Sequence, residues 1–168
     1  MKNVLITGGA KRIGRAIALG LAADGWGVAV HYRGSAEAAA KTVQDIVDAR
    51  GRATALQADL ADVNTLSPLM ERARAEIGPL TALINNASLF ANDDLESLTP
   101  DSWSSHMDTN LRAPLFLAQA FAKQLPKSNS GNIINIIDQR VWRLTPRFLS
   151  YTTSKAGLWT LTQTLAQS

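Results

Sequence analysis

The sequence has no cysteine and only two histidines, His31 and His106, among its 168 residues. Without cysteine the chain can form no disulfide and use no thiol chemistry, and two histidines disfavour the usual zinc sites. Redox chemistry by this chain would therefore need a borrowed cofactor.

Long hydrophobic runs and blocks of like charge are also missing. The longest apolar runs, such as residues 133–137, are far too short to span a bilayer, and the chain enters a strand-like run where a secreted protein would show a signal peptide. Its 17 basic and 14 acidic residues are scattered, which suits an anionic cofactor but not nucleic acid. We therefore expect neither a membrane nor a nucleic-acid partner, and a cytoplasmic location.

The spacing of apolar residues predicts an α/β fold. With 46% hydrophobic residues the chain can bury one core, so we expect a single domain over residues 1–168. Short apolar runs, the expected strands, cover residues 4–6, 28–31, 53–57, 82–85 and 133–137. Segments with apolar residues three and four apart, the expected helices, cover residues 12–23, 37–50, 63–77, 101–111, 114–125 and the chain from residue 150 onward. Uniformly apolar strands are typical of a doubly wound parallel sheet with helices on both faces.

A glycine-bearing turn follows the first expected strand. The run at residues 7–14, TGGAKRIG, places Gly8 and Gly14 between a strand and a helix. In that context the helix N-terminus offers N–H groups and a favourable dipole to a pyrophosphate. Such a turn can also serve only to pack a helix against a strand, but the residues described next favour a dinucleotide-binding domain of the Rossmann type.

The second expected strand ends in residues 31–35, HYRGS, without the carboxylate that usually binds the adenosine ribose about 20 residues after the glycine turn. Arg33 and Ser35 can instead bind a 2′-phosphate. Arg12, at a position where a third glycine often lies, can reach the same group. We therefore expect NADP(H) and not NAD(H); the alternative is that both arginines are solvated surface residues.

A tyrosine and a lysine one helical turn apart form the expected catalytic pair. Tyr151 lies four residues before Lys155, which puts the phenol and the ammonium group on one face of a helix. The cation should stabilise phenolate and lower the phenol's pKa from its usual value near 10. Such a tyrosine can transfer a proton near neutral pH.

Together these residues resemble the short-chain dehydrogenase/reductase family. The resemblance rests on the glycine turn at 7–14, Asp59-Leu60 after the third strand, NNAS at 85–88, Asn110 seven residues after Trp103, and YTTSK at 151–155. It implies that Asp59 and Leu60 flank the adenine, that residues 86–88 line the path from the adenosine-side ribose to the nicotinamide, and that Asn110 anchors a water-linked proton path.

The same resemblance makes Tyr151 the acid that protonates the substrate and Lys155 a ligand of the nicotinamide ribose. The expected cofactor-binding residues are Gly8, Arg12, Ile13, Gly14, Tyr32, Arg33, Ser35, Asp59, Leu60, Asn86, Ala87, Ser88, Tyr151 and Lys155. Two of the assigned residues have other readings: Asn110 can be the amide of a helix kink, and Asp59 a turn residue that caps the next helix.

Most members of the family carry a serine thirteen residues before the tyrosine, where this chain has Asp138. An aspartate at this position resembles the pteridine reductase subgroup. The runs TGGAKRIG, HYRGS and NASLF, the last at residues 86–90, carry the same resemblance. It implies that Phe90 stacks on a flat pterin ring opposite the nicotinamide and that Ser88 helps to orient the ring. The alternatives are core packing for Phe90 and loop capping for Asp138.

We therefore predict an enzyme that uses NADPH to reduce a pterin or dihydropterin C=N bond by hydride transfer, with Asp138 at the ring's nitrogen edge or as a second acid. The expected substrate-binding residues are Ser88, Phe90, Asp138 and Tyr151, and the expected catalytic residues are Asn110, Asp138, Tyr151 and Lys155. The alternatives are a carbonyl reductase of the 3-oxoacyl-carrier-protein reductase type and a non-catalytic dinucleotide sensor.

The resemblance has further implications for assembly and extent. It implies a homotetramer, formed through the helix at 114–125 and the helix after Tyr151. Family members continue with another strand and a substrate loop, so the sequence looks truncated in or after the catalytic helix. We expect the segment that holds Trp142 and Phe148 to border the substrate, and His106 to be exposed.

Overall fold

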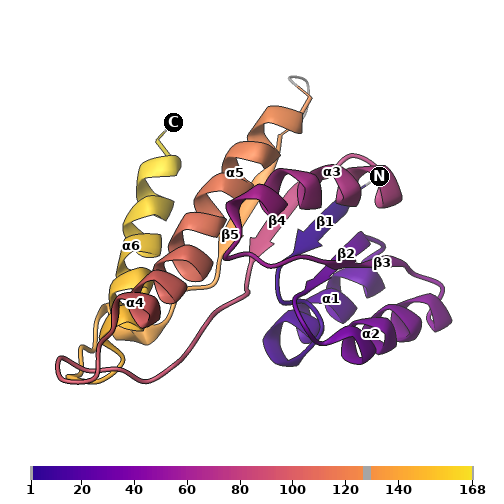
Figure 1. Cartoon of the computed structure of the whole chain (residues 1–168). Coiled ribbons are helices and arrows are strands. Elements are labelled where there is room, and N and C mark those ends of the chain that lie inside the picture. The colour runs from indigo at the N-terminus through magenta and orange to yellow at the C-terminus, as the bar shows by residue number, and fades with distance from the viewer. Residues whose placement is uncertain (1, 127–129, 168) are drawn as a thin grey trace.

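A computed structural model describes residues 2–126 and 130–167, and its centre is a parallel sheet in the order β3-β2-β1-β4-β5 (Figure 1). The strands are β1 Asn3–Ile6, β2 Gly27–Tyr32, β3 Arg52–Gln57, β4 Ala82–Asn85 and β5 Asn132–Asn135. The helices are α1 Arg12–Ala23, α2 Ala36–Asp48, α3 Leu66–Ile77, α4 Pro100–Met107, α5 Ala113–Gln124 and α6 Leu149–Leu165. The order reverses at β1, as expected for a doubly wound sheet.

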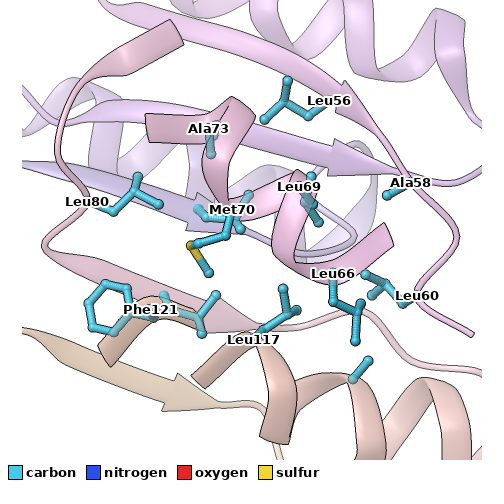
Figure 2. Close-up of a cluster of buried hydrophobic side chains, with 14 of the residues drawn as sticks. Leu56, Ala58, Leu60, Leu66, Leu69, Met70, Ala73, Leu80, Leu117 and Phe121 are labelled. Atoms are coloured by element: carbon cyan, nitrogen blue, oxygen red, sulfur yellow. The ribbon is translucent and has the colours of Figure 1, made fainter. Parts of the chain in front are cut away.

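The alternation of side chains along the strands explains the two layers of helices. From β1, Leu5 points to a core shared with α3 and α5, whereas Val4 and Ile6 point to a core shared with α1 and α2. Figure 2 shows the first core, where Met70 of α3 and Phe121 of α5 meet over the sheet. Each fully buried leucine in such a core contributes roughly 2 kcal/mol to folding.

The expected α/β fold is confirmed, and the expected strands and helices are present with small shifts at their ends. Two of the expected helices are interrupted. The segment at 63–77 begins with a 3₁₀ turn, Val63–Thr65, before α3. The segment at 101–111 becomes α4 followed by a π-helical turn, Asp108–Arg112, because Pro114 has no N–H to donate to the carbonyl four residues earlier.

His106 corrects one expectation, because it is fully buried and not exposed. Its Nδ1 lies 2.8 Å from the carbonyl of Ser102, and its Nε2 accepts a hydrogen bond of 3.2 Å from the amide of Ala91. The segment after β4 and α6 both pack against this face of α4. The pattern of polar and apolar residues along α4 could not predict this burial, because the residues that cover His106 come from other parts of the sequence.

His31 connects the glycine turn to the end of β3. It is buried at the end of β2, where Nδ1 accepts from the Gly8 amide at 3.0 Å and Nε2 donates to the Ala58 carbonyl at 3.2 Å. Burial lowers the pKa of His31 to about 4, against smaller opposing effects of the Ala58 carbonyl and Asp59. Neutral imidazole is the form that fits both partners.

Among the described residues, no helix is long and apolar enough to cross a membrane.

The free energy of unfolding should fall as the pH drops from 6.5 to 4 because of His31. The unfolded chain binds a proton at the ordinary pKa of 6.5 and the folded chain only near 4, so the contribution of neutral His31 is complete above this window and lost below it. The loss should be on the order of 3 kcal/mol. Urea unfolding across the window measures it, and His31→Gln should show a flatter profile. The same pH dependence in both proteins would contradict this role.

Candidate active site

A cleft of about 790 Å³ runs along the edge of the sheet where the parallel strands end. The segments that follow all five strands line it, because carboxyl ends of parallel strands meet at one edge. Every residue expected at the site lines this cleft except Asn110. The lining residues among them are Gly8, Arg12, Ile13, Gly14, Tyr32, Arg33, Ser35, Asp59, Leu60, Asn86, Ala87, Ser88, Phe90, Asp138, Tyr151 and Lys155.

The glycine turn needs its glycines for two separate reasons. Gly8 has a φ of +63°, a left-handed conformation that glycine adopts without strain. A Cβ on Gly14 would lie 2.2 Å from the carbonyl oxygen of Gly8, so only glycine lets α1 approach the turn this closely. The N-terminus of α1 opens onto the cleft, and the lysine at its N-cap has no acceptor with which to cap it. These features fit a bound anion such as a pyrophosphate.

Residues after β1 and β4 brace each other beneath the cleft. The Thr7 hydroxyl accepts hydrogen bonds of 3.0 Å from the amides of both Asn86 and Ala87. In return, the Asn86 side-chain amide donates to the carbonyls of Thr7 and Gly8, at 2.9 and 3.1 Å. The Asn86 side chain therefore holds the glycine turn in place, and its role in lining the cleft is mainly to fix the backbone there.

The adenosine end expected from the sequence is basic. Arg12 and Arg33 both line it, together with Ser35 and with Lys11, which the sequence reasoning had not assigned. Arg12 has a φ of +49°, which costs a non-glycine residue about 1 kcal/mol. A cationic side chain thus occupies a strained position that glycine would fill without cost, and it opens into the cleft.

The opposite end of the cleft brings Tyr151 and Asp138 into direct contact. The Tyr151 hydroxyl donates a hydrogen bond of 2.8 Å to Oδ2 of Asp138. The other oxygen, Oδ1, accepts from the amide of Arg140 at 2.9 Å, so the carboxylate also caps the short turn Gln139–Val141. Asp138 therefore has both of the expected features, because it lines the cleft with one carboxylate oxygen on Tyr151 and caps the loop with the other.

The expected lowering of the Tyr151 pKa by Lys155 is wrong for this arrangement. Burial raises the pKa of the phenol well above its usual value, and the hydrogen bond to Asp138 and the charge of Asp138 raise it further, against weaker opposing effects of Ser88 and Arg140. The Lys155 Nζ lies 5.9 Å from the centre of the Tyr151 ring. Tyr151 is therefore held protonated as a hydrogen-bond donor.

Lys155 is itself perturbed by its surroundings. Only 2% of the residue is exposed, and Nζ donates a hydrogen bond of 2.8 Å to the carbonyl of Ile136. Burial lowers the pKa of Lys155 to about 8, although the charge of Asp138 acts in the opposite direction. Lys155 thus changes charge close to neutral pH, where a proton-transfer site can use it.

Asn110 lies behind the cleft and not in its wall. Its Oδ1 accepts from the Leu89 amide at 2.8 Å, and its Nδ2 donates to the Leu89 carbonyl at 2.9 Å and to the Ser154 hydroxyl at 3.0 Å. The residue is fully buried within the π-helical turn. The side chain acts here as the amide of a helix kink that ties the segment after β4 to α6.

A group of rings borders the Tyr151 end of the cleft. Phe90 and Phe148 stack with their centres 4.4 Å apart and their planes within 1°, and the Tyr151 ring is nearly perpendicular to that of Phe90, with the two centres 4.7 Å apart. The Arg140 guanidinium lies 4.5 Å from the centre of Phe148. Phe148 occupies one face of Phe90, which remains 55% exposed. This group offers flat, electron-rich surfaces and one cation.

Several lining residues were not found from the sequence. They are Ala10, Lys11, Gly34, Leu89, Thr109, Ile136 and Ile137. Most of them adjoin an assigned residue in the sequence, and all but Thr109 lie in segments that follow a strand, so the rule that strand ends meet at one edge was a usable signal. Thr109 follows no strand and is presented by the π-helical turn, which was not expected, although the assigned Asn110 is its neighbour in the sequence. Among residues 2–126 and 130–167, no three His, Asp or Glu side chains gather as a metal site would require.

Comparison with known proteins gives one family and several close structural neighbours. A family model described as short chain dehydrogenase matches residues 2–168. The 3-oxoacyl-[acyl-carrier-protein] reductase of Staphylococcus aureus is 33% identical over 166 residues, which cover 99% of this chain and 68% of that protein. The crystal structure of FolM alternative dihydrofolate reductase 1 from Brucella canis, complexed with NADP, is 44% identical, with a TM-score of 0.95 over 99% of this chain and 67% of its own. An angucycline C-6 ketoreductase with bound NADP is 34% identical, with a TM-score of 0.91 over 99% and 66%.

Replacing Asp138 with asparagine should lower the pKa of the Tyr151 phenol by roughly one unit or more, because it removes the carboxylate charge that disfavours phenolate. The chain has two tyrosines, so a Tyr32→Phe background lets phenolate absorbance report on Tyr151 alone. Asp59→Asn makes the same change of charge elsewhere in the cleft and serves as the control. An unchanged phenol titration in Asp138→Asn would refute this electrostatic role.

Proposed function

This chain belongs to the short-chain dehydrogenase family, and we propose that it uses NADPH to reduce a C=N bond of a pterin or dihydropterin. The observation that carries the proposal is the hydrogen bond from Tyr151 to Asp138, at a position where the resemblance expects serine in carbonyl reductases. The neighbour named as an alternative dihydrofolate reductase, at 44% identity, supports the same substrate class.

Three features of the cleft support NADP(H) as the cofactor. The N-terminus of α1 is suited to the pyrophosphate, Arg12, Arg33 and Ser35 to a 2′-phosphate, and Asp59 with Leu60 to the adenine. Two neighbouring structures contain NADP. Bound there, NADPH would supply the hydride. The protein would hold the nicotinamide and the pterin ring face to face and exclude water from between them.

Proton delivery is assigned to Tyr151. A dihydropterin that accepts hydride at carbon needs a proton at the neighbouring ring nitrogen, and a phenol kept protonated by burial and by Asp138 is a suitable donor. By the family resemblance Lys155 binds the nicotinamide ribose, and its lowered pKa of about 8 lets it be either charged or neutral and so help to replace the proton. Asn110 supports the arrangement from behind through Ser154.

The ring group supports a flat substrate. Phe90 offers a face for stacking, Ser88 and Asp138 line the same end of the cleft, and Asp138 suits the N–H groups of a pterin edge. Arg140, beside the rings, suits a substrate with an electron-rich ring or an anionic tail. A folate carries such a tail, whereas simpler pterins do not.

Two other functions remain as alternatives. The relative named as a 3-oxoacyl-[acyl-carrier-protein] reductase and the neighbour named as a ketoreductase favour reduction of a C=O bond. A dinucleotide sensor would bind NADPH without turnover. The proposal also includes a cytoplasmic homotetramer, for which α5 offers Leu115 and Phe116, each more than a third exposed.

The purified chain should oxidise NADPH only when a dihydropterin is present. Reduced-nicotinamide absorbance is followed with dihydrofolate, with a dihydropterin that has no anionic tail, with a 3-oxoacyl thioester and with no substrate. Tyr151→Phe should lower kcat by about 10²- to 10⁴-fold, and Thr153→Ala, on the exposed side of α6, should not. Turnover of the thioester alone would favour the carbonyl reductase, and NADPH binding without any turnover would favour the sensor.

Arg33→Ala should weaken NADPH binding by roughly 10- to 100-fold, because a charge-assisted contact with the 2′-phosphate contributes about 1.5–3 kcal/mol. NADH lacks that phosphate, so its dissociation constant should change little. Calorimetric titration with both cofactors provides the measurement, and Arg74→Ala, at an exposed position on α3, controls for loss of a positive charge. Equal weakening of both cofactors would reject the assignment of Arg33.

A further inference from the structure

Asp93 is a buried carboxylate that the proposed reaction does not use. It lies in the segment between β4 and α4, only 2% exposed, and does not line the cleft. The sequence alone does not distinguish Asp93 from Asp94, the acidic residue that follows it. Burying a carboxylate is costly unless it is well hydrogen-bonded, so its partners reveal what it does.

Asp93 caps the N-terminus of α6 from another part of the chain. Its Oδ1 accepts from the Ser150 amide at 3.1 Å, and its backbone carbonyl accepts from the amides of Phe148 and Leu149 at 2.6 and 3.3 Å. The N-cap residue of α6 is Phe148, whose hydrocarbon ring cannot cap the helix. The Ser102 hydroxyl of α4 adds a longer bond of 3.4 Å to Oδ2.

The charge of Asp93 suits this position. Burial by itself raises the pKa of the carboxyl group, but hydrogen bonds from Ser150 and Ser102 and the nearby His106 outweigh it and keep the pKa below its usual range. An anion at the N-terminus of a helix is also stabilised by the helix dipole. Asp93 is therefore a charged helix cap that is almost fully buried.

Asp93 connects the two ring-bearing segments at the substrate end. Phe90 lies three residues before it in the same segment, and Phe148 and Tyr151 lie at the start of the helix that it caps. Phe148 has a φ of +60°, which is strained for a bulky residue and persists only where the surroundings hold it. The short bond from the Phe148 amide to Asp93 is one such restraint, and the stacking on Phe90 is another.

Two further side chains hold the Phe90 segment in place. Asn110 holds both backbone groups of Leu89, and the buried His106 accepts from the Ala91 amide. The segment is thus fixed to the π-helical turn and α4. Asn110 also joins it to Ser154, farther along α6, whereas Asp93 joins it to the first turn of that helix. Loss of the cap would free Tyr151 to shift against Phe90 while leaving the glycine turn intact.

We propose that Asp93 is a positioning residue, which caps α6 and thereby sets Tyr151 and Phe148 against Phe90 for the reaction. The proposal about turnover rests on the proposed function, whereas the capping itself can be measured without a substrate. Two readouts are therefore needed, kinetics with a dihydropterin and hydrogen exchange of backbone amides.

The test compares Asp93→Ala, Asp93→Asn and the control Asp94→Asn in the full chain. Asp93→Ala should lower kcat with dihydrofolate by roughly 10- to 100-fold, since a displacement of about 1 Å at a reacting group costs that much, and NADPH affinity should stay within about twofold. Asp93→Asn keeps an acceptor for the Ser150 amide and should restore much of kcat. Exchange in a peptide spanning 148–155 should speed up about tenfold or more in Asp93→Ala but not in a peptide spanning 12–23.

Each outcome bears on the proposal. Unchanged exchange at the start of α6 in Asp93→Ala would overturn the capping role. Faster exchange in both peptides, with weaker NADPH binding, would mean that Asp93 only stabilises the fold. Altered exchange with unchanged kcat would overturn the positioning role. If the unmodified chain reduces no dihydropterin, the proposed function fails, and the exchange result still decides whether Asp93 caps α6.

Discussion

Parallel pairing of β1 with β2 on one side and β4 on the other is the constraint on which the site depends. It brings the carboxyl ends of three strands to one edge, so the segments that leave them must diverge around a shared space. Thr7, the first residue after β1, holds the amides of the segment after β4, and Gly8 holds His31 at the end of β2. These cross-links hold the segments that line the cleft, because the side chains of Thr7, Asn86 and His31 fix the backbone there.

Electrostatics at the Tyr151 end follow from burial more than from any single charge. Lysine and tyrosine on one helix face suggest a lowered phenol pKa, yet both groups are almost fully buried, and Asp138 replaces the neutral partner expected of carbonyl reductases. Desolvation disfavours phenolate and ammonium alike, so it moves the two pKa values apart: up for Tyr151 and down for Lys155. Such a site holds its proton on the phenol and has a neighbouring amine able to exchange one near neutral pH.

The two ends of the cleft depend on different parts of the fold. The glycine turn is held by β-strand neighbours, whereas the rings near Tyr151 depend on α6, whose first turn is secured by residues from the segment after β4 and by α4. Asn110 interrupts a helix to reach Leu89 and Ser154, and Pro114 makes that interruption possible by lacking an N–H. The π-helical turn therefore links the segment after β4 to α6, the helix that carries Tyr151.

The sequence by itself determined the order of strands and helices, the parallel sheet and most residues of the cleft, because apolar spacing, the glycine turn and the tyrosine–lysine spacing are local signals. The sequence did not predict where β5 ends, the break between α4 and α5, or the burial of His106, because each depends on contacts between distant segments. The direction of the Tyr151 pKa and the role of Asp93 belong to the same class. Local spacing fixes which face of a helix a side chain occupies, but only tertiary packing decides how much water it loses and which distant group becomes its partner.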